Sequence, residues 1–209
     1  QNTPEARQML ADIYGGTTDV AIKRAVLRGY AANRDKERLG AAAKSGGKIF
    51  NTGTGDLYLT FKGDSVAYHR GASTVPDTTA YLPTFSPNGA IVLTKGNVYV
   101  KGTVKGRYSV GSLDSVSGSS SGRVIVTDDI RYYSDPRTNP SSTDMLGVVA
   151  WNDVQVAGDE TKTSFTIHAS MFSYKMGVTV KNYSTRASGY FYTLGGWVVE
   201  NIYATSDGV

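Results

Sequence analysis

Short runs of β-branched and apolar residues, separated by Gly, Asn, Asp or Ser, dominate the chain from residue 46 onward. Such runs bounded by turn residues are typical of strands. In the middle of the chain they predict strands at residues 90–93, 98–100, 107–110, 123–126 and 147–150. Toward the end they predict strands at residues 164–174, 177–183 and 189–203.

The first part of this region predicts a β-hairpin. Leu57, Leu59 and Phe61 alternate with polar positions, as in a half-buried strand. Residues 62–65 contain Gly and Asp and turn the chain into a second strand at residues 66–69. Residues 71–89, with three prolines among Ser, Thr and Asp, predict a surface loop.

The repeated Ile/Val-x-Val spacing with Gly or Asn-Asp at the corners favours a mainly β fold, namely a right-handed parallel β-solenoid resembling a β-helix. A β-sandwich or a twisted antiparallel sheet is the alternative. The whole β-rich domain is expected to cover residues 46–209.

Residues 1–45 have a different period. Apolar residues at helical spacing, such as Ile13 and Tyr14 or Val26 and Leu27, predict amphipathic helices at residues 3–14 and 18–30 and a weaker one at 35–44. This pattern resembles a HEAT-type helical repeat of about one and a half units. A single unit cannot bury its own apolar face, so this short helical module needs a partner to pack on.

Composition narrows the functional classes. The 209 residues include no Cys, which excludes disulfides, thiolate metal sites and Cys nucleophiles. No apolar run is long enough to span a bilayer, so no transmembrane segment is expected in this chain. The net charge is +4, and acids interleave with the bases of residues 1–45, which indicates a solvated surface and no nucleic-acid partner.

Four acidic residues form the only candidate metal site. If the loop after residue 132 folds back, three carboxylates could share one Ca²⁺ with backbone carbonyls, since Ca²⁺ takes six to eight oxygen ligands. In the alternative interpretation, Asp129 pairs with Arg131, and the other acids fix turns and loop ends by accepting backbone N–H bonds. The four candidate ligands are Asp128, Asp129, Asp135 and Asp144.

Three patterns that could indicate catalysis are weak. Asp128 and Asp129 are adjacent, so on a regular strand they would face opposite sides and could not form a glycosidase pair. Residues 118–122 match G-x-S-x-G, but a strand follows them instead of the helix that a nucleophile elbow requires. His69 and His168 are isolated, which favours structural roles and excludes a zinc site.

Aromatic residues offer another kind of site, because their rings could contact sugars or a partner subunit, while the simpler interpretation places about half of them in the interior. They are Tyr132, Tyr133, Trp151, Tyr174, Tyr183, Tyr190, Tyr192, Trp197 and Tyr203.

From residue 81 onward the sequence resembles an uncharacterised bacterial cell-envelope domain family that accompanies type IV pilus-assembly and minor-pilin-type proteins. The likeness rests on NG at residues 88–89, GNVYVKG at 96–102, TDDIRY at 127–132, DP at 135–136, STDMLGVVA at 142–150, HAS at 168–170, KNY at 181–183 and LGG at 194–196. The resemblance implies an envelope location, a solenoid-like fold and a structural role, but no activity. The hydrophobic anchor expected of such chains is missing, and the helical module stands in its place.

These observations lead to the expectation of a non-catalytic structural protein of the cell envelope or the extracellular space, associated with pili or filaments. It would act through self-association or adhesion, with itself, other envelope proteins or polysaccharide as partners and no cofactor besides the Ca²⁺ considered above. A carbohydrate-binding or carbohydrate-cleaving β-helix is the alternative function. A helical adaptor that docks a partner through residues 1–45 is a third.

Overall fold

The computed structural model describes residues 8, 9, 12, 47–51, 55–72, 74–116, 120–186 and 189–200. The chain divides into two compact units, Gln1–Gly46 and Gly47–Val209. In the first unit Gln8, Met9 and Asp12 are helical, and the rest of the predicted helical module lies outside the described residues. The second unit holds all the strands that the structure describes.

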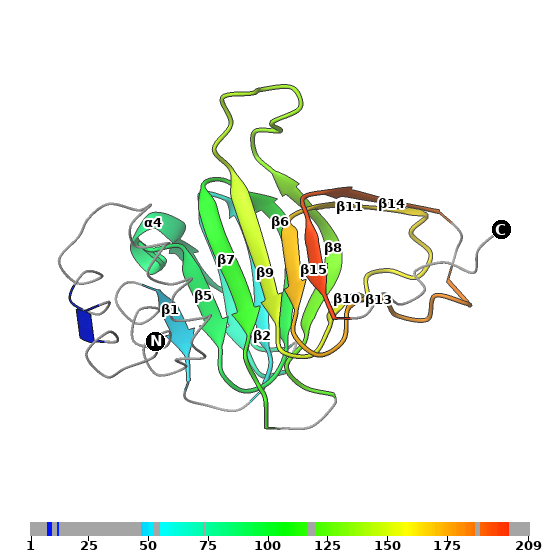
Figure 1. Cartoon of the computed structure of the whole chain (residues 1–209), viewed down its shortest axis with the longest axis horizontal. Coiled ribbons are helices and arrows are strands. Elements are labelled where there is room, and N and C mark those ends of the chain that lie inside the picture. The colour runs from blue at the N-terminus through cyan, green and yellow to red at the C-terminus, as the bar shows by residue number, and fades with distance from the viewer. Residues whose placement is uncertain are drawn as a thin grey trace. The chain divides into compact units, whose positions relative to one another are not determined.

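One sheet of the second unit, called sheet A here, is entirely parallel (Figure 1). Its strands follow one another across the sheet in the same order as along the chain. They are β1 (Lys48–Phe50), β5 (Ala90–Leu93), β7 (Arg107–Ser112), β9 (Met145–Ala150), β12 (Ser170–Ser173) and β15 (Trp197–Val199).

The other sheet, sheet B, is mixed. Its parallel part runs in the order β13, β10, β8, β6, β2, and β11 and β14 continue it beside the second half of β8. The antiparallel strands β3 and β4 follow β2 at one edge. The strands are β2 (Leu57–Gly63), β3 (Ser65–Arg70), β4 (Thr78–Tyr81), β6 (Val98–Val104), β8 (Val124–Tyr132), β10 (Val154–Val156), β11 (Ser164–His168), β13 (Val178–Val180) and β14 (Tyr190–Leu194).

From β5 onward the chain alternates between the two sheets. It passes from β5 in sheet A to β6 in sheet B, back to β7 in sheet A, and then to β8 in sheet B. Each strand from β7 to β9 pairs in parallel with the strand that precedes it in the same sheet, so β7 pairs with β5, β8 with β6 and β9 with β7. The prediction of a mainly β domain with parallel strands is confirmed, and the antiparallel pairs are confined to β2–β3 and β3–β4.

Inward-facing apolar side chains of both sheets form one core. In sheet B, Val98, Val124, Val154 and Val178 lie side by side on four neighbouring strands, and each is at most 2% exposed. The corresponding row of sheet A consists of Ile91, Val110, Val148 and Met171. Side chains of this shape pack well on a pleated surface, which explains why short β-branched runs form these strands.

Buried polar side chains lie at the corners between the sheets, where the backbone leaves the strands. The carboxylate of Asp114, 2% exposed, accepts the backbone N–H groups of Gly96 (2.8 Å) and Val116 (3.1 Å). Asn97 accepts the N–H of Arg123 through its side-chain oxygen (3.0 Å). These bonds satisfy backbone groups that the strands cannot pair, as buried polar groups require.

Three segments differ from the sequence prediction. The expected loop at residues 71–89 contains β4 and a short helix, α4 (Leu82–Phe85), because residues 78–81 pair with β3 and Leu82 is fully buried. The expected single strand at 164–174 is interrupted at Ala169, where the chain crosses from β11 in sheet B to β12 in sheet A. The segment at 189–203 likewise contains two strands, β14 and β15.

Gly102 lies within β6, between β2 and β8, with φ +103. A Cβ there would lie 2.2 Å from the carbonyl oxygen of Phe61 on β2. A side chain at this position therefore has both an unfavourable φ and no space.

We predict that Gly102→Ala lowers the free energy of unfolding by about 3 to 5 kcal/mol, because β2 and β6 must separate to admit the methyl group. Gly71→Ala is the matched control, since Gly71 has φ +93 but nothing within 4 Å of its Cβ position. Gly71→Ala should lower the free energy of unfolding by only about 1 to 2 kcal/mol. Urea unfolding followed by circular dichroism measures both, and equal losses would contradict the close approach.

Candidate functional site

Two of the predicted carboxylates, Asp128 and Asp129, lie on β8 where its pairing with β6 shifts. Val126 pairs with Val100 and Ile130 with Gly102, so β8 has two more residues than β6 between these pairs. Such a bulge turns side chains away from strict alternation. The sequence argument that the two carboxylates face opposite sides is therefore wrong.

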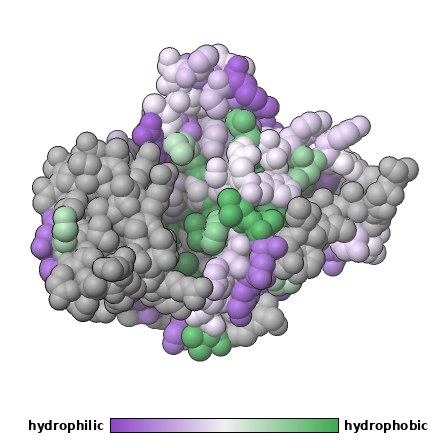
Figure 2. All heavy atoms as spheres, in the orientation of Figure 1, coloured by the Kyte–Doolittle hydropathy of each residue, from purple (hydrophilic) through white to green (hydrophobic). Residues whose placement is uncertain are grey.

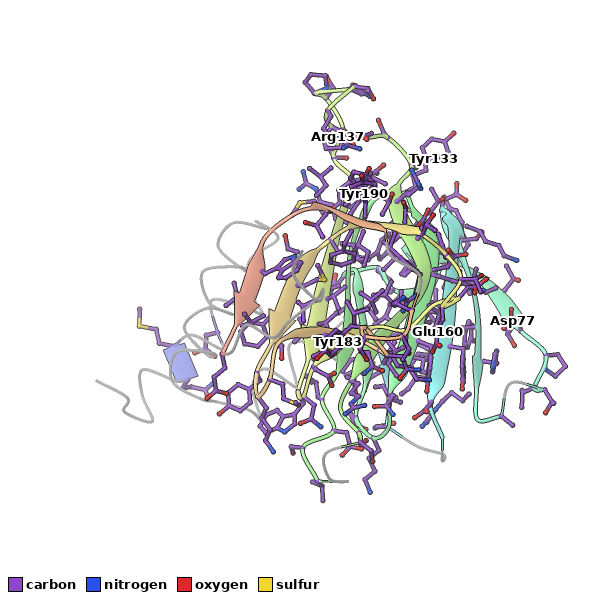
Figure 3. The ribbon with its side chains drawn as sticks, turned by 90° about the vertical axis from the view of Figure 1, so that its right-hand side faces the viewer. Asp77, Tyr133, Arg137, Glu160, Tyr183 and Tyr190 are labelled. Carbon is purple, nitrogen blue, oxygen red and sulfur yellow. The ribbon has the colours of Figure 1, made fainter. Side chains whose placement is uncertain are left out.

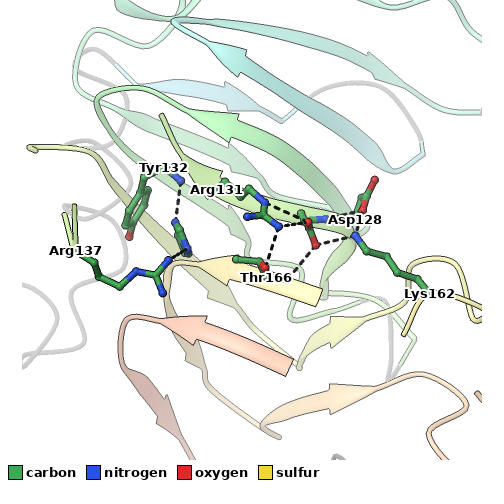
Figure 4. A network of polar contacts seen from close by, with 8 residues as sticks. Asp128, Arg131, Tyr132, Arg137, Lys162 and Thr166 are labelled. Carbon is green, nitrogen blue, oxygen red and sulfur yellow. Dashed lines mark hydrogen bonds and ion pairs between the residues drawn. The ribbon is translucent and has the colours of Figure 1, made fainter. Parts of the chain in front are cut away.

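Both carboxylates bind the same ammonium group (Figure 4). Lys162, in the loop before β11, donates to Asp128 at 2.6 Å and to Asp129 at 2.7 Å. The Lys162 side chain is 30% exposed, so water screens these ion pairs only in part.

Asp129 has further donors. Its Oδ1 accepts the backbone N–H of Thr166 on β11 at 2.9 Å. Its Oδ2 accepts from the guanidinium of Arg131 at 2.8 Å, and Arg131 also donates to the hydroxyl of Thr166 at 3.1 Å. The pairing of Asp129 with Arg131 is the one proposed in the structural interpretation of the sequence.

These contacts hold both acids in their charged form. The hydrogen bond from Lys162 lowers the pKa of the Asp128 carboxyl. Burial raises the pKa of Asp129, but hydrogen bonds from Lys162 and the Thr166 N–H outweigh it and bring that pKa to about 2. Burial in turn lowers the pKa of the Lys162 ammonium, and its two carboxylate partners outweigh this effect and raise it.

The other two predicted ligands lie in or beside the loop between β8 and β9. Asp144 accepts the N–H groups of Gly106 (2.7 Å) and Ser134 (2.8 Å), so it closes the base of the loop. Asp135 accepts the N–H of Arg137 at 2.9 Å and pairs with its guanidinium. Hydrogen bonds from Arg137 lower the pKa of Asp135 to about 2. Figure 3 shows the part of the loop with Arg137 extending beyond the strand ends.

The four carboxylates thus divide into the Asp128–Asp129 pair and two separate loop contacts. Each accepts hydrogen bonds from nitrogen donors, and no cluster of three or more His, Asp or Glu side chains that could hold a metal occurs among the described residues. The alternative interpretation agrees with the Asp129–Arg131 pair and with the backbone contacts of Asp128, Asp135 and Asp144, but it did not include the contacts of Asp128 and Asp129 with Lys162. We therefore build no function on Ca²⁺.

The ion-paired residues border a shallow hollow of about 420 Å³ on the outer surface of sheet B. Its wall combines two carboxylates, three cationic side chains and two hydroxyl groups, so it offers both donors and acceptors. The lining residues are Thr60, Lys101, Gly102, Thr103, Asp128, Asp129, Arg131 and Lys162.

His168 has a structural contact. It is 3% exposed, and its Nδ1 accepts the backbone N–H of Tyr132 at 3.1 Å. Burial lowers the pKa of His168, which favours the neutral ring that this bond requires.

His69 belongs to an aromatic row on the outer surface of sheet B. Its Nδ1 lies 2.6 Å from a carboxylate oxygen of Asp77. Its ring stacks on Tyr58, which in turn stacks on Tyr99, with centroids 4.5 Å apart in both pairs. Because stacked rings cover one another, the faces between them are closed to a sugar.

Among the described aromatic residues named from the sequence, the largest exposed group lies at the last strands. Tyr190 is 71% exposed, Tyr192 54% and Trp197 37%. The described part of the G-x-S-x-G segment ends in a turn before β8, and the hydroxyl of Ser121 there donates to Asp114. Tyr203 lies outside the described residues.

Lys162 was not identified from the sequence, although it contacts both predicted acids. It follows Asp129 by 33 residues and lies in a loop, so neither a spacing nor a motif connects them. Only the parallel pairing of β8 with β11 brings it to the bulge.

Comparisons of the chain with protein-family models, with curated proteins and with solved structures find no match. The family resemblance expected from the sequence stays a prediction, and the interpretation of the site rests on its geometry.

We predict that Asp129→Asn lowers the free energy of unfolding by about 2 kcal/mol at neutral pH, because the folded-state pKa lies below the ordinary value of 3.8. A lowered carboxyl pKa stabilises the fold above the unfolded-state pKa, and this contribution disappears as the pH falls through the folded-state pKa. The difference between variant and parent should therefore close between about pH 4 and pH 2.

Denaturant unfolding at a series of pH values measures this difference. Asp64→Asn is the control, since that carboxylate is half-exposed and lies 3.7 Å from Lys105, and it should change stability by no more than about 0.5 kcal/mol. A stability difference for Asp129→Asn that stays constant down to pH 2 would contradict the ion-pair assignment.

Proposed function

We propose that the chain is a non-catalytic structural protein of the cell envelope or the extracellular space, and that its β-rich unit is a parallel β-solenoid acting through association. From β5 onward the chain alternates between the two sheets and each strand pairs in parallel with an earlier strand of the same sheet, which supports a solenoid. Parallel crossovers are almost always right-handed, which gives the expected hand of the coils.

The observation that carries this proposal is the edge formed by β14 and β15. Within the described part of the chain, β14 pairs only with β11 and β15 only with β12. Neither strand contains a charged residue or a proline. Soluble proteins usually protect edge strands with charges, prolines or bulges, so an aromatic edge without them favours pairing with another chain.

An exposed edge of this composition suits a protein that assembles with copies of itself or with other envelope proteins. The resemblance noted in the sequence agrees with such a role and with association with pili or filaments. Among the described residues, no helix is long and apolar enough to cross a membrane.

Carbohydrate binding is the second candidate function, and the hollow on sheet B favours it. Its mixture of hydroxyl, carboxylate and cationic groups can donate to and accept from the hydroxyls of a sugar. Carbohydrate cleavage is less favoured, because a glycosidase needs a carboxylic acid with a raised pKa. Here the environments of Asp128 and Asp129 lower the pKa of both acids.

We predict that Tyr192→Lys weakens self-association at the β14–β15 edge by about tenfold or more, because a charge on an edge strand opposes pairing. The Tyr192 side chain is 54% exposed, so the fold should tolerate the change. Sedimentation of the full chain over a range of concentrations measures the effect. Tyr133→Lys, at a 65% exposed loop position, is the control. Identical association of parent and Tyr192→Lys would refute edge-mediated assembly.

For the second function, we expect a glycan array to show binding that Lys101→Ala reduces, since Lys101 lines the hollow. Lys175→Ala removes a cation that lies over the ring of Trp151, outside the hollow lining, and should leave glycan binding unchanged. Absence of binding to every glycan tested would eliminate this function.

A further inference from the structure

Outward apolar side chains of sheet A form a row on five of its six strands. The pairing register places these residues on one line from β1 to β15. Burial alternates along β5, β9 and β12, so the neighbours of these residues on those strands point into the core. The apolar row consists of Ile49, Val92, Val149, Phe172 and Val198, and buried Gly111 on β7 interrupts it between Val92 and Val149.

A second outward row, two residues earlier on β5, β7, β9 and β12, contains only small residues. It consists of Ala90, Ser109, Gly147 and Ser170. On the other side of the apolar row lie Trp151 and Tyr174, whose rings stack at 4.5 Å. On the outer face of sheet A a row of small residues thus borders a row of bulkier apolar ones.

This face carries almost no charge. In the six strands of sheet A the charged residues are Lys48 and Arg107. Phe172 is 39% and Val198 62% exposed. Figure 2 shows hydrophobic side chains gathered on the side of the molecule where Figure 1 shows β7, β9 and β15.

The outer face of sheet B, in contrast, carries charged side chains. Its outward positions include Lys62, Lys101, Asp129 and Arg131, which lie on the neighbouring strands β2, β6 and β8. A sheet with one face on the core normally has polar residues on the other. Sheet A departs from this pattern, and an apolar patch of this kind marks an interaction surface.

We propose that the outer face of sheet A is a dimer interface, and that a second copy of this chain occupies it face to face. In a two-fold arrangement the row of bulkier side chains on one copy lies over the row of small side chains on the other. The same contact repeats in reverse, so the surface is complementary to itself, as an isologous interface requires. Sheets packed in this way lie about 10 Å apart with interlocking side chains.

The size of the face sets the strength of the contact. The six strands of sheet A contain 26 residues, with three to six residues in each strand. At ~3.3 Å per residue and ~4.8 Å between strands they cover roughly 400 Å² per copy. The total of about 800 Å² is below the size of a stable interface and is that of a weak, transient one. We therefore expect a weak dimer, with a dissociation constant on the order of 10 to 100 µM.

This inference goes beyond the proposed function, because the face and the β14–β15 edge are different surfaces. Val149→Lys places a charge in the middle of the face, on an outward position of the interior strand β9. It should weaken dimerisation at least about tenfold by sedimentation equilibrium of the full chain. Phe172→Lys on β12 should act in the same way, and Tyr133→Lys in the loop after β8 should have no effect.

Because the chain has no Cys, introduced thiols report the contact directly. In the two-fold arrangement Ser170 of one copy lies over Phe172 of the other, since these residues belong to the two facing rows and to the same strand. A mixture of Ser170→Cys and Phe172→Cys chains should therefore form a disulfide-linked dimer on mild oxidation, whereas a mixture of Tyr133→Cys and Phe172→Cys chains should not. Adding Val149→Lys to both chains should abolish the crosslink, while adding Tyr192→Lys should leave it intact.

Each outcome decides between the surfaces. Weakened association in Tyr192→Lys together with an unchanged crosslink between Ser170→Cys and Phe172→Cys chains supports both proposals. A crosslink between these chains that persists when both carry Val149→Lys would overturn the face-to-face dimer and leave the edge untouched. A parent that stays monomeric while Val149→Lys lowers its unfolding temperature would also overturn it, because the face would then be covered from within the same chain.

Discussion

The parallel, in-register pairing of short valine-rich strands is the constraint on which the described part of this protein depends. Val98, Val124, Val154 and Val178 occupy one row of the core, and each must point inward. Side chains alternate with a period of two, so a slip of one residue would exchange the core face and the outer face of a strand. The row therefore fixes the outward positions as well. The stacked rings of Tyr58 and Tyr99 and the apolar row on sheet A both follow from this register.

The bulge in β8 is the main departure from this regularity, and it creates the polar site. Two extra residues allow Asp128 and Asp129 to reach one ammonium group, which a regular strand would not permit. The resulting chemistry is that of a compensated ion pair. Both acids have a lowered pKa, so neither is suited to deliver a proton near neutral pH. The ion pairs with Lys162 hold β8 against the segment before β11.

Local patterns in the sequence predicted the strands well and their connections less well. The alternation at residues 57–61 and the apolar runs at 90–93 and 147–150 each correspond to a strand. The break at Ala169 was missed because the residues on either side have the same strand composition, and only the crossing between sheets separates β11 from β12. The contact of Lys162 with Asp129 was missed for a related reason. It depends on which strands are neighbours in space, and no local pattern carries that information.

The distribution of charge gives the two sheets different roles. Charged side chains are concentrated on β2, β6 and β8 of sheet B, where water or a polar ligand can meet them. Sheet A leaves Val149 and Phe172 outward without such neighbours, although its inner face already contributes to the core. The stability of the single chain does not require apolar residues on that outer face, because a polar residue at an outward strand position lowers the free energy of unfolding only slightly. Burial of this outer face against a second copy, as proposed above, would account for their presence.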